Sequence, residues 1–146
     1  MPVGLDDIDH RLLDELIHDG RLSVRALAER VHISRANAYS RIERLRADGV
    51  LNGFTAIVDP VRMGLTMSAY LALTVRQNSW RDLTKCLRRI PEVEHMALVS
   101  GDIDVMLLVR TTDKDALRRL VLDQVQELPG VLTTRTLLIF DDLTNR

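Results

Sequence analysis

Hydrophobic residues in the first third of the chain recur every three or four positions, which is the spacing of one face of an α-helix. They predict three helices. The first begins at Asp6 and Asp7 and ends at Gly20, the second begins after Ser23, and the third begins after Ser34. Only two residues separate the second helix from Ser34, so the chain has to turn abruptly there. Two helices joined by a short turn are typical of a helix-turn-helix, whose second helix lies in the major groove of DNA.

The third predicted helix combines an apolar face with side chains suited to DNA. Ala38, Ile42 and Leu45 follow the helical spacing and are expected in the core, with Ser34 as the N-cap. The other positions supply hydrogen-bonding groups for base edges and positive charge for phosphates. The predicted DNA-contacting residues are Ser34, Arg35, Ala36, Asn37, Tyr39, Ser40, Arg41, Arg44 and Arg46.

These residues are expected to play different parts. Base edges are assigned to Arg35, Asn37, Tyr39 and Ser40, and phosphates to Arg41, Arg44 and Arg46. Two positions have a structural alternative, because Tyr39 can pack against the neighbouring helix and Arg41 can pair with Glu29 or an acid of the first helix. Arg35 is the strongest candidate for base recognition, since a guanidinium binds guanine through two hydrogen bonds.

Charge is distributed unevenly along the chain. The 146 residues carry a net charge of -1, but Leu5–Asp19 contains six acids and one arginine. Arg21–Arg46 contains seven arginines against Glu29 and Glu43, a local net charge of +5. This stretch predicts a basic surface. Arginine binds phosphate through two parallel hydrogen bonds, so its use here favours a nucleic-acid partner over an ordinary solvated face.

The helical pattern ends at Gly49. Residues 50–58 form a short extended run that predicts a wing or a hinge strand, and Asp59-Pro60 breaks it. Residues 61–66 lack periodicity and carry Gly64, so we expect the domain boundary there. The chain is accordingly divided into a helix-turn-helix domain at 1–52, a linker strand or hinge at 53–66 and a second domain at 67–146.

The second domain repeats a pattern of strand, helix and strand. Two similar segments, 90–93 and 128–131, lie 38 residues apart, and each follows an amphipathic helix and opens a strand. Strands are predicted at 68–76, 93–100, 103–110 and 131–139, and helices at 80–89 and 114–127. A tight hairpin at Gly101-Asp102 joins the two halves, which gives the βαββαβ order of a ferredoxin-like fold and an α+β class for the chain.

Both helices of such a domain cover the same face of the sheet. The opposite face then needs another cover, and the apolar segments 70–73 and 105–109 supply a surface for it. We expect a second copy of the chain to cover this face, which predicts at least a homodimer.

The remaining composition argues against several classes of protein. Cys86 is the single cysteine, so an internal disulfide is impossible, and it has no partner at metal-ligand spacing. The longest apolar run, Met67–Val75, is far shorter than the roughly 20 residues of a membrane span. The N-terminus lacks the basic region of a signal peptide. We expect a cytoplasmic protein with no membrane association, metal, cofactor or catalytic residues.

Several motifs resemble the Lrp/AsnC family of feast/famine transcription regulators, and the resemblance covers essentially the whole chain. The matching segments are 5–13 for the opening helix, 31–34 and 41–45 for the recognition helix, 49–56 for the linker strand, 99–104 for the Gly-x-x-Asp effector loop, and 128–131 with 134–136 for the start of the last strand. Positions 35–37, 39 and 40 depart from common family patterns, so the operator sequence cannot be transferred.

The resemblance implies a dimer that often assembles into octamers, double-stranded DNA as a partner, and a small effector, usually an amino acid, held between C-terminal domains. In the effector loop Gly101 permits a tight turn. Asp102 and Asp104 either attract an α-ammonium group or hydrogen-bond the turn's own amides. The implied effector-binding residues are Val99, Ser100, Gly101, Asp102, Asp104, Thr136 and Leu137.

Two other functions stay open from the sequence. Some haem-pathway decarboxylases of the sirohaem type resemble the same family, but such chemistry needs cationic or imidazole groups around a tetrapyrrole, and His95 is the only histidine after residue 32. The other is an amino-acid-binding regulatory module without DNA binding, against which the arginine-rich helix argues. We expect a sequence-specific DNA-binding regulator and no enzyme activity.

Overall fold

The computed structural model describes residues 4–143 and divides into two compact units, one ending at Ile57 and the other beginning at Val58. This division lies inside the stretch 53–66 that the sequence assigns to the connection between domains, but before residues 61–66, where the sequence places the boundary itself. Each unit has a hydrophobic core of its own. No helix among residues 4–143 is both long enough and apolar enough to cross a membrane.

The first unit contains three helices, which are α1 at Asp7–His18, α2 at Val24–Val31 and α3 at Arg35–Ala47. Each begins where a side-chain oxygen accepts a backbone N–H from the first turn. The pairs are Asp6 with Asp9 at 2.8 Å, Ser23 with Ala26 at 3.1 Å and Ser34 with Asn37 at 3.1 Å. These caps confirm the three predicted helix starts.

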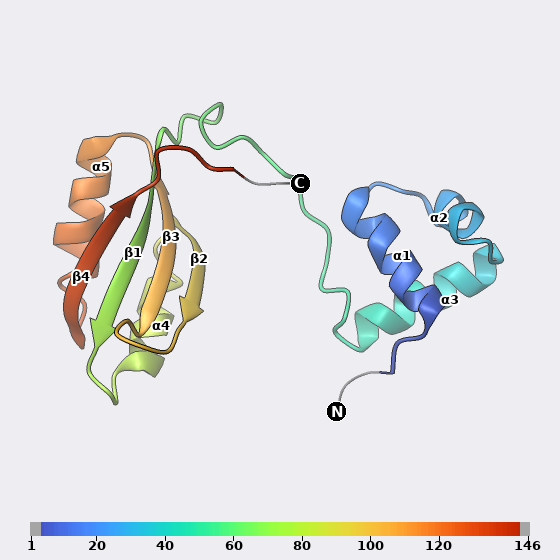
Figure 1. Cartoon of the computed structure of the whole chain (residues 1–146), viewed down its shortest axis with the longest axis horizontal. Coiled ribbons are helices and arrows are strands. Elements are labelled where there is room, and N and C mark those ends of the chain that lie inside the picture. The colour runs from blue at the N-terminus through green and yellow to red at the C-terminus, as the bar shows by residue number, and fades with distance from the viewer. Residues whose placement is uncertain (1–3, 144–146) are drawn as a thin grey trace. The chain divides into compact units, whose positions relative to one another are not determined.

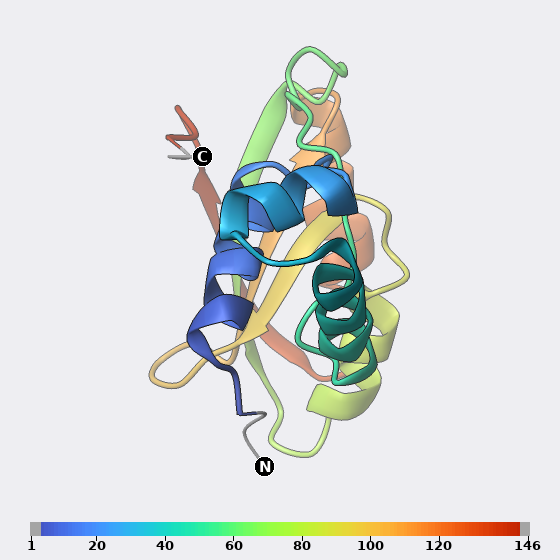
Figure 2. The same ribbon diagram turned by 90° about the vertical axis from the view of Figure 1, so that its right-hand side faces the viewer.

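An abrupt turn at His32 joins α2 to α3. His32 adopts a left-handed backbone conformation with φ of 60° and donates its N–H to the carbonyls of Ala28 and Glu29, which ends α2. Figure 2 shows α3, drawn in teal, leaving this turn in a new direction. The core beneath the pair is built from Leu12, Leu16, Leu27 and Val31, and Ala38 and Leu45 are fully buried. The predicted helix-turn-helix is therefore confirmed.

The segment after α3 differs from its prediction. Residues 52–58 have no regular secondary structure, so the expected wing or hinge strand at 50–58 is wrong. A strand needs neighbouring backbone with which to exchange hydrogen bonds, and nothing in residues 4–143 pairs with this segment. The side chains of Phe54 and Ile57 are consequently 55% and 77% exposed.

The second unit follows the predicted βαββαβ order (Figure 1). Its elements are β1 at Met67–Val75, α4 at Trp80–Leu87, β2 at Val93–Leu98, β3 at Val105–Thr111, α5 at Lys114–Arg119, a π-helical continuation η1 at Leu120–Val125, and β4 at Val131–Leu138. The strands lie in the order β2-β3-β1-β4, and all neighbours are antiparallel. This confirms the ferredoxin-like fold.

Both helices pack on one face of this sheet, as Figure 1 shows. The core includes Leu71 and Leu73 from β1 and Leu107 from β3, all fully buried, and the helices add Leu83, Leu87, Leu117 and Leu120. Burying one leucine side chain stabilises the fold by about 1.5 to 3 kcal/mol. Tyr70 and Leu137, which face each other across β1 and β4, remain 43% and 44% exposed.

The connection between β2 and β3 is longer than the predicted two-residue hairpin. Residues 99–104 form the loop, in which the Val99 N–H donates to the Asp104 carbonyl at 3.0 Å. Gly101 has φ of +115°, a conformation that favours glycine. The predicted tight turn is therefore wrong in length. The chain leaves the strand ladder at Leu98, and the loop bends back through Gly101 before β3 begins.

Candidate DNA-binding face and effector loop

The start of α3 presents polar side chains to solvent. Ser34, Arg35, Ala36, Asn37, Tyr39 and Ser40 are all exposed. Tyr39 is 59% exposed, so most of its side chain is open to solvent, and packing against a neighbouring helix, its structural alternative, does not bury it. Arg35 makes no ion pair with any residue between 4 and 143. This end of the helix therefore carries a free guanidinium beside hydroxyl and amide groups.

The second half of α3 is tied to α1 by ion pairs. Arg41 Nη1 lies 2.7 Å from an Asp6 carboxylate oxygen and 2.8 Å from Asp9 Oδ1, while Arg44 Nη2 lies 2.6 Å from Asp9 Oδ2. Arg41 Nε also donates to Asn37 Oδ1 at 2.9 Å. The alternative of an ion pair with an acid of the first helix is thus the arrangement found for Arg41, and Arg44 shares it.

Asp9 is the centre of this network and is only 1% exposed. Its burial pushes its pKa upward, but hydrogen bonds from Arg44, from the Asp6 backbone N–H and from Arg41 outweigh this effect and hold the pKa at about 2. Hydrogen bonds to the carboxylates of Asp6 and Asp9 raise the pKa of Arg41, and the hydrogen bond to Asp9 raises the pKa of Arg44. All these groups are therefore charged at neutral pH, and the acids of α1 neutralise both arginines.

Most other arginines of the basic stretch also have acidic neighbours. Arg30 lies 2.8 Å from Glu15, Arg25 lies 3.1 Å from Glu29, and Arg46 lies 3.7 Å from Glu43. Among the seven arginines of this stretch, Arg21 and Arg35 have no ion pair with any residue between 4 and 143. Arg30 joins α2 to α1, whereas Arg25 and Arg46 pair within their own helices, so fewer free positive charges remain than the count of arginines indicates.

The effector loop is held to the sheet through Asp104. Asp104 Oδ2 accepts the Val75 N–H at 2.8 Å, and the Asp104 N–H donates to the Leu73 carbonyl at 2.9 Å. Ser100, Gly101 and Asp102 are exposed at the loop tip, and Val99 is 41% exposed beside them. Asp104 therefore braces the loop against β1, whereas the Asp102 carboxylate has no hydrogen-bond partner within residues 4–143.

Thr136 and Leu137 do not join this loop within one chain. They lie on β4, which is separated from β3 by β1. In register they face Leu71 and Tyr70, two or more residues away from the end of β1 that Asp104 contacts. Two strand spacings of about 4.8 Å each already exceed contact distance. The predicted effector residues therefore form two separate groups.

A cavity of about 270 Å³ lies beside the effector loop. It is lined by Val75, Gln77, Trp80, Leu98, Asp104 and Val105. Gln77, Trp80 and Leu98 were not predicted as site residues. The predicted strand topology could have identified these residues. Antiparallel pairing of β1 with β3 brings the C-terminal end of β1 next to the start of β3, which the effector loop precedes.

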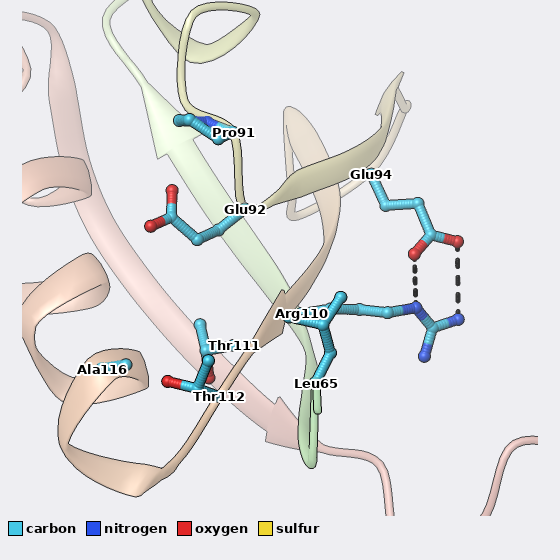
Figure 3. Close-up of a pocket in the computed structure, with 8 residues that line it drawn as sticks. All are labelled: Leu65, Pro91, Glu92, Glu94, Arg110, Thr111, Thr112 and Ala116. Atoms are coloured by element: carbon cyan, nitrogen blue, oxygen red, sulfur yellow. Dashed lines mark hydrogen bonds and ion pairs between the residues drawn. The ribbon is translucent and has the colours of Figure 1, made fainter. Parts of the chain in front are cut away.

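A second cavity, of about 350 Å³, lies at the other end of β3 (Figure 3). Pro91, Glu92 and Thr111 are among its lining residues, and the Glu94–Arg110 ion pair lies to one side of it. Arg110 is 9% exposed. It also donates to Ser68 Oγ at 2.8 Å and pairs with Asp142 at 2.8 Å, so it ties the residues after β4 to the central strands.

The burial of Arg110 lowers its pKa, but the ion pairs with Glu94 and Asp142 more than compensate, so the pKa is raised overall. This arginine is therefore a permanently charged structural tie.

Comparison with known proteins identifies the family of both units. A family described as "AsnC-type helix-turn-helix domain" matches residues 5–46, and one described as "Lrp/AsnC ligand binding domain" matches residues 68–146. The chain belongs to the Lrp/AsnC family. These matches cover α1 to α3 except the last residue of α3, and the βαββαβ unit except its first residue, so they agree with the resemblance drawn from the motifs.

Curated Lrp/AsnC relatives match along nearly the full chain. The leucine-responsive regulatory protein of Escherichia coli K12 is 31% identical over 142 residues, which is 95% of this chain and 87% of that protein. The HTH-type transcriptional regulator FL11 of Pyrococcus horikoshii is 30% identical over 139 residues, covering 95% of this chain and 91% of FL11. The proline dehydrogenase transcriptional activator of Rhizobium radiobacter is 31% identical, covering 94% and 92%.

Solved Lrp/AsnC structures have the same fold. A transcriptional regulator from Neisseria meningitidis in complex with L-Met superposes with a TM-score of 0.90 at 26% identity and covers 97% of this chain and 94% of that chain. The leucine response regulatory protein LrpA of Mycobacterium tuberculosis gives a TM-score of 0.86 at 33% identity, covering 97% and 96%.

This chain is therefore a DNA-binding transcriptional regulator of the Lrp/AsnC family. The named relatives are regulators, which favours this function over the haem-pathway decarboxylase and over a module without DNA binding.

Proposed function

We propose that the first two turns of α3 read the DNA sequence. The base-contacting side chains are Arg35, Asn37, Tyr39 and Ser40, with Ser34 and Ala36 close to the backbone of the same groove and Arg46 at a phosphate. The observation that carries this proposal is the free guanidinium of Arg35 on an exposed helix start. Asn37 contributes its side-chain NH₂, because its oxygen accepts from Arg41.

Arg41 and Arg44 have a positioning role in this proposal. Their guanidinium groups fix α3 against α1 through Asp6 and Asp9, so the angle at which α3 enters the groove depends on them. Their contribution to phosphate binding is small, because the carboxylates already neutralise them.

The experiment compares Arg35→Ala with Arg21→Ala, a matched control that loses a guanidinium with no ion pair in the same unit. Fluorescence anisotropy measures binding to a duplex that the wild-type protein selects from a random-sequence pool, and to a shuffled duplex. A bidentate arginine contributes about 1 to 3 kcal/mol of base discrimination, so R35A should lose roughly 5- to 150-fold in the affinity ratio of the two duplexes.

R21A should leave that ratio unchanged. Equal ratios for R35A and the wild-type protein, with the fold intact, would rule out base recognition by Arg35.

We also propose that an amino acid is the effector and binds at the loop 99–104. The Neisseria relative was solved as an L-Met complex, and its fold matches this chain throughout. The free carboxylate of Asp102 suits an α-ammonium group, Ser100 supplies a hydroxyl, and the backbone at Gly101 permits close approach. Val99 adds an apolar wall. Isothermal titration with a panel of amino acids tests this assignment, and unchanged binding by Asp102→Ala would contradict it.

A second copy of the chain completes the assembly that we propose. The uncovered sheet face carries Tyr70 and Leu137, and a homodimer through this face buries both. Thr136 and Leu137 reach an effector only from another copy, because they do not meet the loop within one chain. Such dimers assemble further into an octamer. The protein lies in the cytoplasm, and its partner there is double-stranded DNA. Light scattering should report a dimer or larger species, and Tyr70→Asp should shift it toward monomer, whereas Ile17→Asp in the first unit should not.

A further inference from the structure

Helix α4 carries a basic surface that the helix-turn-helix does not explain. Arg81 and Lys85 of α4, Arg88 at its C-cap and Arg89 in the turn that follows are all exposed, and we refer to these four residues as the α4 stripe. Arg76 is exposed just before the helix. Residues 76–89 contain five cations and one acid, Asp82, which gives a local net charge of +4 in a chain whose overall charge is -1.

The stripe lies along one side of the helix. Residues spaced four and seven positions apart share a helical face, as Arg81, Lys85 and Arg88 do. Leu83 and Leu87, on the opposite side, are buried against the sheet. At about 1.5 Å per residue, Arg81, Lys85 and Arg88 extend over roughly 10 Å along the helix axis, and Arg89 follows in the next turn of the chain. The sheet therefore holds the stripe outward as a rigid row of charge.

These cations are not neutralised by the fold. Arg76, Arg88 and Arg89 have no acid within ion-pair distance among residues 4–143. Lys85 lies 3.7 Å from Asp82, but the two side chains are 75% and 90% exposed, and such a pair contributes little. Arg81 lies over the Trp80 ring at 5.1 Å, which keeps its charge in place without cancelling it.

The other helix on this face of the sheet has no such excess. Residues 114–127, which span α5 and η1, contain three cations and three acids. The positive charge of the helical layer is therefore concentrated on α4.

We propose that the α4 stripe is a second DNA-binding surface, which contacts phosphates outside the sequence that α3 reads. This inference rests on the proposed function only in that DNA is the partner. Duplex DNA carries about one negative charge per 1.7 Å of its axis, so a row of cations about 10 Å long faces several phosphates. Three of the four cations are arginines, which bind phosphate through two hydrogen bonds. The contact is independent of sequence, so it adds affinity and salt dependence without adding specificity.

The experiment uses two variants of the full chain with the same loss of charge. Arg88→Gln with Arg89→Gln removes half of the stripe, and Arg118→Gln with Arg119→Gln is the matched control on α5, where both arginines are exposed. Binding is measured at several salt concentrations to a 20-bp duplex and to a 60-bp duplex. Both contain the same selected site, and the longer one adds mixed-sequence flanks.

On the 60-bp duplex, the α4 variant should reduce the slope of log K against log salt by about 2, since each phosphate contact contributes about 0.9. Its affinity there should fall by about tenfold or more at 0.1 M salt. The control should change the slope far less. On the 20-bp duplex both variants should behave like the wild-type protein.

Equal slopes for the two variants on the 60-bp duplex would overturn the inference, and this result would also be expected if the stripe binds an acidic protein instead. A wild-type protein that binds both duplexes with the same slope would overturn it as well. A failure of Arg35→Ala to reduce binding to the selected site would count against the proposed function alone. Arg81→Gln with Lys85→Gln gives the same test if the Arg88 and Arg89 variant does not fold.

Discussion

Rows of cationic side chains lie on α3 and on the α4 stripe, but only the row on α3 forms ion pairs with acids of a neighbouring helix. In α3, Arg41 and Arg44 lie 2.6 to 2.8 Å from carboxylates of α1, and Asp9 is buried between them. At the C-terminal end of α4, Arg88 and Arg89 have no acid within ion-pair distance among residues 4–143. A basic helix therefore has available for DNA only those charges that no neighbouring helix has already neutralised.

The largest expected effect follows from removing the charge that holds α3. Asp9→Asn should lower the free energy of unfolding by about 3 kcal/mol, because it leaves Arg41 and Arg44 without their shared partner. Urea unfolding followed by circular dichroism at pH 7 measures this. The matched control is Asp7→Asn, since Asp7 is exposed and makes no ion pair within residues 4–143. Equal losses in the two variants would show that Asp9 does not brace α3.

Acid should weaken the same contact. The pKa of Asp9 is about 2 in the folded protein against an ordinary value of 3.8, so its stabilising contribution is complete above pH 4 and is lost as pH falls through 2. This shift corresponds to about 2 kcal/mol. Unfolding free energies measured from pH 5 to pH 2 should fall by this much more in the wild-type protein than in the Asp9→Asn variant. Parallel pH profiles for the two proteins would contradict the lowered pKa.

A smaller effect on stability is expected at the effector loop, where the Asp104 carboxylate accepts a backbone hydrogen bond and the Asp102 carboxylate accepts none from residues 4–143. Asp104→Ala should cost about 1 kcal/mol, because it removes the acceptor of the Val75 N–H. Asp102→Ala should leave stability unchanged, since Asp102 is exposed at the loop tip. Thermal unfolding of the two variants measures the difference. A more destabilising change at Asp102 than at Asp104 would reverse the roles that the geometry gives them.

The smallest effect is expected at the C-terminal end of α4. Replacing Arg88 and Arg89 together by alanine should change the unfolding free energy by less than about 0.5 kcal/mol, because exposed side chains without partners contribute little to stability. Arg41→Ala, measured alongside in urea, should cost far more, since its guanidinium bonds to Asp6, Asp9 and Asn37. Similar losses of unfolding free energy in the two variants would contradict the claim that Arg41 is held by ion pairs while Arg88 and Arg89 are not.

Features set by neighbouring residues could be predicted from the sequence. The hydroxyls of Ser23 and Ser34 accept hydrogen bonds from backbone N–H groups only three positions further along the chain. The local sequence pattern alone therefore locates the starts of α2 and α3. The βαββαβ order follows from the repeat at 90–93 and 128–131 for the same reason. Local periodicity is sufficient for these elements.

Features set by distant residues could not be predicted so well. Arg41 and Asp6 are 35 positions apart, and only the packing of α3 on α1 decides which acid the arginine meets. The strand expected at 50–58 depends on backbone that residues 4–143 do not supply. Gln77 and Trp80 border the cavity at the effector loop because β1 and β3 pair. No sequence motif around these two residues indicates that pairing. In each case the missing information is which segments become neighbours.

One measurement tests the central claim, that the exposed start of α3 reads DNA while Arg41 holds the helix in place. Each of the wild-type, Arg35→Ala and Arg41→Ala proteins is used to select binding sites from a random-sequence pool. The account predicts that Arg35→Ala loses preference at one or two base pairs of each half-site, whereas Arg41→Ala selects the wild-type consensus with lower affinity. A consensus that is unchanged for Arg35→Ala and relaxed at a defined base pair for Arg41→Ala would contradict it.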